Sequence, residues 1–159
     1  MEKMEVLRQY FGLSSFREGQ QTLIDAVLAG RDVLGVMPTG GGKSLCYELP
    51  ALLLPGLTLV ISPLISLMKD QVMALQNAGI PAGCIHSAMS VEELREAYRD
   101  TRFGAYKILY IAPERLLTDG FCALAQELEI PLLAVAEAHC LSQGGQDSRP
   151  SSLTTLAFL

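Results

Sequence analysis

Apolar residues follow two patterns along the chain, short continuous runs and stripes at helical spacing. Runs of four or five mostly apolar residues predict buried strands, and they cover residues 33–37, 57–61, 82–85, 108–111 and 132–136. Stripes that repeat every three or four positions predict helices over residues 2–11, 17–29, 64–77, 91–100 and 114–128, with another helix beginning near residue 44. Because short buried strands alternate with helices, we expect an α/β domain whose mostly parallel sheet is covered by helices on both faces.

Local signals refine two of these helices, and the end of the chain breaks the pattern. Ser90 followed by Glu93 predicts a capping box for the helix at 91–100. Pro50 should bend the helix that begins near residue 44, or end it early. Ser, Gly, Gln and Thr are frequent after residue 141, so we expect residues 142–159 to form an irregular tail.

The composition is that of a single folded domain. The chain has 159 residues, of which 50% are hydrophobic and 18% charged, and these values exclude a disordered chain. No apolar stretch approaches the roughly 18 residues that a membrane span needs, and the charged residues near the N-terminus are unlike a secretion signal. The four widely spaced cysteines lack a C-x-x-C pair and indicate reduced thiols in a cytoplasmic protein. With a net charge of −5, the chain would need a local surface to hold nucleic acid.

The first predicted strand runs directly into Met37-Pro38-Thr39-Gly40-Gly41-Gly42-Lys43-Ser44, and a helix follows. Glycines let backbone N–H groups close around phosphate oxygens, and the helix directs its positive dipole end towards them. This order predicts a nucleotide site for ATP and Mg²⁺ at residues 39–44, in which Lys43 reaches the β- and γ-phosphates and Ser44 offers its hydroxyl to Mg²⁺. Met37 stands where the general pattern has glycine, and the alternative interpretation is a glycine-rich turn with an unrelated lysine.

Four strings together carry a family resemblance. They are Phe16-Arg17-Glu18-Gly19-Gln20-Gln21, the phosphate loop MPTGGGKSLCY, Ser62-Pro63-Leu64-Ile65-Ser66-Leu67-Met68-Lys69-Asp70-Gln71 and Tyr110-Ile111-Ala112-Pro113-Glu114-Arg115-Leu116. In this order and at these spacings the chain resembles the RecQ family of DNA helicases, whose phosphate loop does not begin with glycine. The resemblance implies a RecA-like P-loop NTPase domain, the first motor domain of an ATP-dependent 3′–5′ DNA helicase of recombination and repair.

The resemblance gives residues near the N-terminus the task of binding the adenine base. Gln20, with Arg17 beside it, is assigned to adenine, and a side-chain amide can both donate to and accept from an adenine edge. The alternative is that both are ordinary surface residues of the helix at 17–29. Where the family often has an aromatic residue to stack on the base, this chain has Leu13, which offers apolar contact alone.

Two other strings are assigned to single-stranded DNA. Ser62 and Pro63 lie where a predicted strand ends and a helix begins, a place where hydroxyl and N–H groups can hold phosphates. Pro113, Glu114 and Arg115 follow another strand, and the family uses this segment on its DNA side. The alternatives are a plain strand–helix turn at the first segment and a surface pair of Arg115 with Glu114 at the second.

The chain departs from the family after its fifth predicted strand. Where the family has Asp-Glu-Ala-His, this chain has Ala136-Glu137-Ala138-His139. The missing aspartate would hold the Mg²⁺ shell beneath the phosphates. Glu137 is retained, and the resemblance implies that it polarises the attacking water. The candidate catalytic residues are therefore Lys43 and Glu137. We therefore expect ATP to bind but its hydrolysis to fall by orders of magnitude.

The segment that senses DNA in the family is also altered. Gly144 stands where a tryptophan is expected and Ser148 where a phenylalanine is expected, so no aromatic face is left for base stacking. DNA binding should be weak.

These assignments divide the chain into N-terminal helices with the adenine motif (1–30), a RecA-like ATP-binding domain (31–141) and the tail (142–159). Family helicases also need a second RecA-like domain, which a partner chain would have to supply in trans. Two further interpretations remain: a non-enzymatic ATP- or DNA-binding module derived from a helicase, and an unrelated P-loop kinase or small ATPase.

Overall fold

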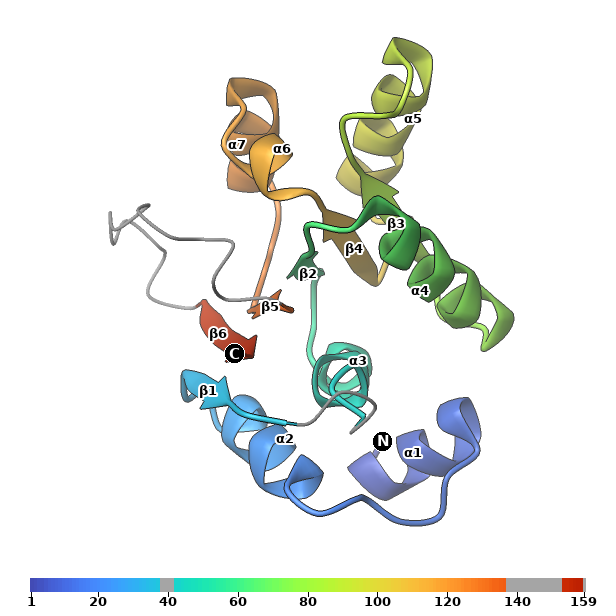
Figure 1. Ribbon diagram of the computed structural model, residues 1–159, viewed down its shortest axis with the longest axis vertical. Helices are drawn as coiled ribbons and strands as arrows, with labels where there is room; N and C mark the ends of the chain where they lie inside the picture. The colour runs from blue at the N-terminus through green and yellow to red at the C-terminus, as the bar shows by residue number, and fades with distance from the viewer. Residues whose placement is uncertain (38–41, 137–152, 159) are drawn as a thin grey trace.

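The computed structural model describes residues 1–37, 42–136 and 153–158, and its centre is a sheet with helices on both sides (Figure 1). The described strands are β1 (Val33–Gly35), β2 (Thr58–Ile61), β3 (Ala82–Ile85), β4 (Ile108–Ile111), β5 (Leu132–Val135) and β6 (Thr154–Phe158). They form a six-stranded sheet in the order β1-β6-β5-β2-β4-β3, and every neighbouring pair is parallel. The alternation of strand and helix patterns along the chain predicts this arrangement.

The helices pack against the two faces of the sheet in two sets. They are α1 (Lys3–Phe11), α2 (Gln20–Leu28), α3 (Leu45–Leu53), α4 (Ile65–Asn77), α5 (Val91–Arg102), α6 (Pro113–Leu116) and α7 (Asp119–Gln126). Helices α1 to α4 lie on one side of the sheet, and α5 and α7 lie on the other (Figure 1). Apolar side chains of α1 to α4 share one core with the sheet, and those of α5 and α7 share a second core with it. No helix in the described ranges is long and apolar enough to cross a membrane.

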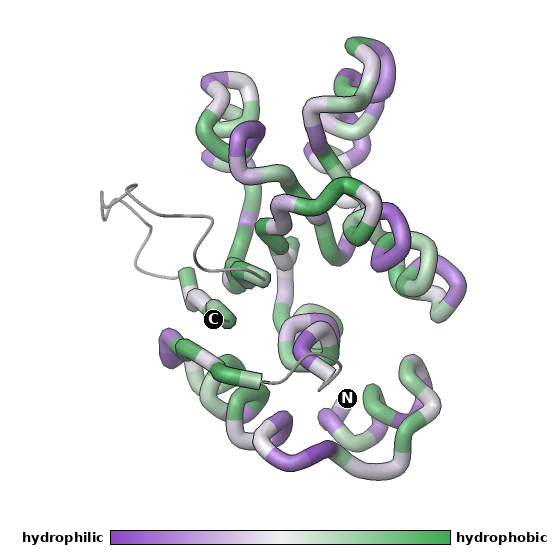
Figure 2. Tube along the Cα trace, viewed as in Figure 1, coloured by the Kyte–Doolittle hydropathy of each residue, from purple (hydrophilic) through white to green (hydrophobic). Residues whose placement is uncertain are grey.

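The strands at the middle of the sheet are buried on both faces, as their continuous apolar runs predict. All four residues of β2 and of β4 are buried. In Figure 2 the strands are mostly in the hydrophobic colour, whereas the helices alternate between hydrophobic and hydrophilic residues. Helical periodicity accounts for this alternation, because each helix covers the sheet with one side and meets solvent with the other.

Three predictions concern individual helices. The capping box of α5 is confirmed, because the Glu93 N–H donates to Ser90 Oγ at 3.1 Å and the Ser90 N–H donates to Glu93 Oε1 at 2.9 Å. Pro50 lies inside α3, which continues to Leu53 before it ends. The helix predicted over 114–128 is in fact two helices, α6 and α7, because Thr118 caps a new helix by accepting from the Phe121 N–H at 3.3 Å.

The prediction of an irregular tail over 142–159 is wrong for residues 154–158. These residues form β6, which lies between β1 and β5 and is therefore an interior strand of the sheet. Leu156 and Phe158 are buried in the core, and they alternate with the partly exposed Thr155 and Ala157, as expected for a strand. The prediction missed this alternation because it rested on the polar composition of the preceding residues. Residues 137–152 lie outside the described residues, and the domain boundaries at 30 and 141 stay predictions.

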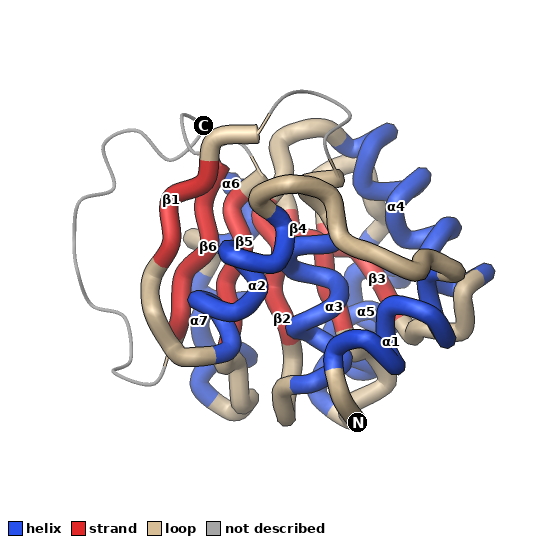
Figure 3. Tube along the Cα trace, turned by 90° about the horizontal axis from the view of Figure 1, so that it is seen from below, coloured by secondary structure: helices blue, strands red, loops and turns tan. Residues whose placement is uncertain are grey.

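Because all the described strands are parallel, their carboxyl ends meet at one edge of the sheet (Figure 3). Backbone hydrogen bonds hold the segments beyond the strands side by side, from the Ser62 N–H to the Ile111 carbonyl at 3.1 Å and from the Ala136 N–H to the Ile61 carbonyl at 3.1 Å. In open α/β sheets this edge is where ligands bind.

Candidate nucleotide site

The phosphate loop connects β1 to α3 at this edge. Gly42 has φ of 82°, a left-handed conformation that glycine adopts without strain, and a Cβ there would overlap the amide of Gln20. Ser44 is the N-cap residue of α3, so its side chain lies at the positive end of that helix. The Lys43 ammonium lies 5.9 Å from the centroid of the Phe158 ring. Thr39, Gly40 and Gly41 lie outside the described residues.

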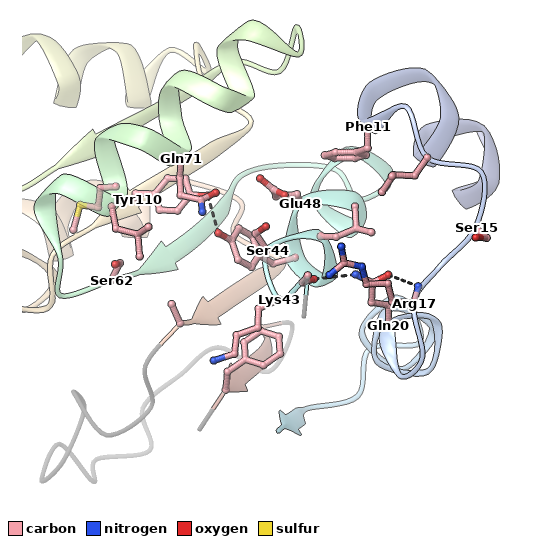
Figure 4. A pocket seen from close by; sticks show the side chains of 18 residues that line it. Phe11, Ser15, Arg17, Gln20, Lys43, Ser44, Glu48, Ser62, Gln71 and Tyr110 are labelled. Atoms are coloured by element: carbon pink, nitrogen blue, oxygen red, sulfur yellow. Dashed lines mark hydrogen bonds between the residues drawn. The ribbon is translucent and has the colours of Figure 1, made fainter. Parts of the chain in front are cut away.

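A cavity of about 650 Å³ opens beside the end of this loop (Figure 4). It extends from the α1–α2 connection across α3 to α4 and the ends of β2, β4, β5 and β6. The described residues that line it with polar groups are Ser15, Arg17, Gln20, Lys43, Ser44, Tyr47, Glu48, Ser62, Gln71 and Tyr110. The structure therefore brings Arg17 and Gln20 to the same cavity as Lys43 and Ser44, although more than 20 positions separate the two pairs in sequence.

The Gln20 side chain connects the N-terminus of α2 to the phosphate loop through hydrogen bonds. Its Oε1 accepts from the Arg17 N–H at 2.7 Å, and its Nε2 donates to the Gly42 carbonyl at 3.1 Å (Figure 4). An amide group has two N–H donors and two acceptor lone pairs, so one of each takes part in no hydrogen bond among the described residues. Gln20 is buried, which excludes the alternative of an ordinary surface residue for it. Leu13 also lines the cavity and is half exposed.

A buried polar cluster forms one wall of the cavity. The hydroxyl groups of Tyr47 and Tyr110 are 2.7 Å apart, and burial raises the pKa of both phenols. Burial also raises the pKa of the Glu48 carboxyl, to about 7, against the opposing effect of a hydrogen bond with the Ser44 side chain. Glu48 belongs to none of the ion pairs in the described part of the chain.

The residues assigned to DNA lie at the same edge of the sheet but differ in exposure. Ser62 is buried and lines the cavity, and its Oγ has no hydrogen-bond partner among the described residues, whereas Pro63 is exposed. Pro113 begins α6, and Glu114 is exposed and accepts from the Ser87 hydroxyl at 3.4 Å. The buried Nε of Arg115 has no partner in the part of the chain that the structure describes, and the expected alternative, an ion pair with Glu114, is absent from the ion pairs of that part.

The chemistry of the donors fits a magnesium ion that a nucleotide brings with it. Ser44 and Ser62 offer hydroxyl oxygens and Glu48 offers carboxyl oxygens, and Mg²⁺ binds through oxygen while relying on one or two carboxylates plus phosphates. The buried, unpartnered Oγ of Ser62 is the kind of atom that a bound ligand or its water satisfies. Ala136, which lines the cavity after β5, brings no oxygen in its side chain. Glu137 lies outside the described residues.

Several residues of the site escaped prediction from the sequence. Phe158 was assigned to the tail, although the apolar residues of 153–159 were a signal for a strand. Tyr47, Glu48 and Tyr110 carried no signal of their own, because a pairing between residues 63 positions apart depends on how α3 packs on the sheet.

Comparison with known proteins now places the chain in a family. The model of the DEAD/DEAH box helicase family matches residues 17–157, so the chain belongs to this family.

Within that family, the chain is clearly similar to RecQ helicases. The chain is 52% identical over 147 residues to "ATP-dependent DNA helicase RecQ" of Bacillus subtilis, and 49% identical over 147 residues to the protein of the same name in Haemophilus influenzae. The match covers 92% of this chain in both cases, but only 25% and 24% of the relatives. The chain thus spans about a quarter of the length of these curated relatives. The resemblance to RecQ helicases is confirmed.

Solved structures agree on the fold. A hypothetical ATP-dependent RNA helicase from Sulfolobus tokodaii superimposes with a TM-score of 0.73 at 20% identity, covering 98% of this chain and 49% of that one. The helicase MrfA, bound to DNA, gives a TM-score of 0.76 at 17% identity, covering 99% of this chain and 26% of that one. The α/β, RecA-like fold class is confirmed.

Proposed function

We propose that this chain is an ATP-binding motor domain of a RecQ-like 3′–5′ DNA helicase that acts in recombination and repair. The observation that carries the proposal is the gathering of Lys43, Ser44, Arg17 and Gln20 around one cavity at the carboxyl edge of the sheet. The relatives' names, which include ATP and DNA, support it.

Each of these residues has a part in holding the nucleotide. The Lys43 ammonium leaves the Phe158 ring and binds the β- and γ-phosphates, with the backbone of Thr39, Gly40, Gly41 and Gly42 around them. The free donor and acceptor of the Gln20 amide bind the adenine edge. When bound, Mg²⁺ neutralises charge on the phosphate oxygens, and Ser44 contributes its hydroxyl to the ion's shell.

Hydrolysis by this chain should be slow. Ala136 stands at the carboxyl end of β5, where an aspartate would hold the shell of the metal ion. Glu137 is proposed to polarise the attacking water. Each loss of about 1.4 kcal/mol of transition-state stabilisation lowers the rate tenfold, so the loss of several kcal/mol lowers it by orders of magnitude.

DNA would lie along the same edge of the sheet. Ser62 with Pro63 and the segment Pro113, Glu114 and Arg115 are neighbours there, because β2 and β4 pair in register up to Ile61 and Ile111. We propose weak contact with single-stranded or duplex DNA, and movement along it only when a second RecA-like domain closes on the nucleotide.

A second candidate function is a non-enzymatic ATP- or DNA-binding module derived from a helicase. The methyl side chain of Ala136 in the cavity favours it, because this is the position at which hydrolysis would fail while binding persists.

Two measurements separate these functions. Nucleotide binding with Mg²⁺ is titrated first, and ATP turnover is then compared with and without single-stranded DNA. Both proposals predict binding; turnover near the background rate supports the module, and slow turnover above it supports the motor domain. Fast, DNA-stimulated turnover by the chain alone would contradict the account of Ala136. The variant Ala136→Asp, assayed with a second motor domain, should recover turnover, and no recovery would show that Ala136 is not the main defect.

A further inference from the structure

Glu48 is the one acidic side chain among the described residues that line the nucleotide cavity. It lies on α3, four positions after Ser44, so the two side chains project from the same side of the helix. Only 7% of Glu48 is exposed. The interior position is unusual for an acidic residue that has no basic partner among the described residues, since burying such a group without compensation is costly.

Glu48 lies in the same cavity as the proposed metal ligand, Ser44. An interaction with the Ser44 side chain lowers the pKa of the Glu48 carboxyl, against the larger effect of burial. A serine hydroxyl that gives a lone pair to a metal ion must place its proton on another acceptor. Among the described residues that line the cavity, Ala136 has no oxygen in its side chain to serve as that acceptor, and Ser62, Gln71 and Tyr110 lie outside α3.

We propose that Glu48 is a positioning residue: its carboxyl accepts the proton of the Ser44 hydroxyl and so turns a lone pair of Ser44 towards the Mg²⁺ of the bound nucleotide. In the family an aspartate at position 136 would help to hold the Mg²⁺ shell, and Ala136 has no carboxylate. Glu48, one turn beyond Ser44 on α3, takes over part of that role. This inference rests on the proposed function, because it concerns the ion that accompanies ATP.

The test measures how strongly Mg²⁺ tightens nucleotide binding, which requires no turnover. A fluorescent ADP analogue is titrated into the purified chain in the presence of Mg²⁺ and again in EDTA, and the ratio of the two dissociation constants is compared between variants. Glu48→Met removes the acceptor with little change in length, and Glu48→Gln keeps an acceptor oxygen. Glu92→Met is the matched control, since Glu92 is exposed on α5.

In Glu48→Met we expect the Mg²⁺ ratio to fall by about tenfold or more, as for other changes in groups that orient a metal ligand. Affinity in EDTA should stay within about twofold, Glu48→Gln should retain most of the ratio, and Glu92→Met should match the unaltered chain. In a Ser44→Ala background the substitution of Glu48 should have no further effect, since the hydroxyl that it orients is gone.

Three results bear on the proposal in different ways. An unchanged Mg²⁺ ratio in folded Glu48→Met, or an equal fall in the Ser44→Ala background, would overturn the role of Glu48 and leave the nucleotide site standing. An unaltered chain that binds nucleotide equally with and without Mg²⁺ would overturn it also. Absence of nucleotide binding by the unaltered, folded chain would instead overturn the proposed function. If Glu48→Met fails to fold, Glu48→Ala, which also removes the acceptor, takes its place: its Mg²⁺ ratio should fall likewise, and an unchanged ratio would overturn the role of Glu48.

Discussion

The buried carboxyl of Glu48 makes the stability of the nucleotide-free, metal-free domain depend on pH. Burial raises its pKa from an ordinary 4.5 to about 7. Between these two values the unfolded chain releases the proton that the folded chain keeps, so the free energy of unfolding falls as pH rises towards 7 and levels off above it. Each pKa unit corresponds to about 1.4 kcal/mol, so the full effect is on the order of 3 kcal/mol.

Glu48→Gln removes the ionisation and keeps the shape of the side chain. We therefore expect the variant to be more stable than the unaltered chain by up to about 3 kcal/mol at pH 8, and to differ little from it at pH 4.5. Urea denaturation at a series of pH values from 4.5 to 8 measures both free energies of unfolding, and EDTA keeps metal ions away. Glu92→Gln, an exposed acid on α5, is the control and should change neither value measurably.

The sign of the difference in free energy of unfolding between Glu48→Gln and the unaltered chain tests whether burial raises the pKa. A loss of stability in Glu48→Gln at pH 8, or a difference that stays constant from pH 4.5 to 8, would show that the carboxyl is not held in its neutral form by burial.

Three other predictions concern the packing and the cavity. Tyr47→Phe should cost about 1–3 kcal/mol, because it leaves the buried Tyr110 hydroxyl without its partner. The double replacement of Tyr47 and Tyr110 by Phe should cost less than the two single changes together, and strictly additive losses in urea denaturation would contradict the pairing. Leu13→Tyr should tighten ATP binding by roughly fivefold, about 1 kcal/mol from an aromatic ring against the base, and equal affinities in titration would refute the placement of the base. Gly83→Ala should lower the melting temperature, because its Cβ would lie 2.6 Å from the Tyr106 ring, at a cost of about 1–3 kcal/mol. Tyr106→Leu should relieve that cost, and an unchanged melting temperature in Gly83→Ala would count against the packing.

The sequence predicted the parts of the fold that periodicity records. The apolar runs at β2 and β4 and the capping residues of α5 are local signals, and the structure has the corresponding elements. The strand β6 was missed because its residues follow a polar stretch, and because its burial depends on insertion between β1 and β5, which are distant in sequence.

The candidate site divides in the same way. Lys43 and Ser44 could be predicted because the residues of a phosphate loop are consecutive in the sequence. The contacts of Gln20 with the Gly42 carbonyl and of Tyr47 with Tyr110 join distant segments, and no pattern along the chain records them. Glu48 lay one helical turn beyond the motif, and its burial became visible only when the packing of α3 was known.

The most direct test of the nucleotide cavity is a titration of the folded chain with ADP and ATP at low salt, followed by calorimetry or by fluorescence of an analogue. We expect saturable binding of one nucleotide per chain, its loss in Lys43→Ala, and its retention in Arg95→Ala, which removes an exposed positive charge from α5. A chain that is demonstrably folded by circular dichroism and yet has no measurable affinity for either nucleotide would contradict the account.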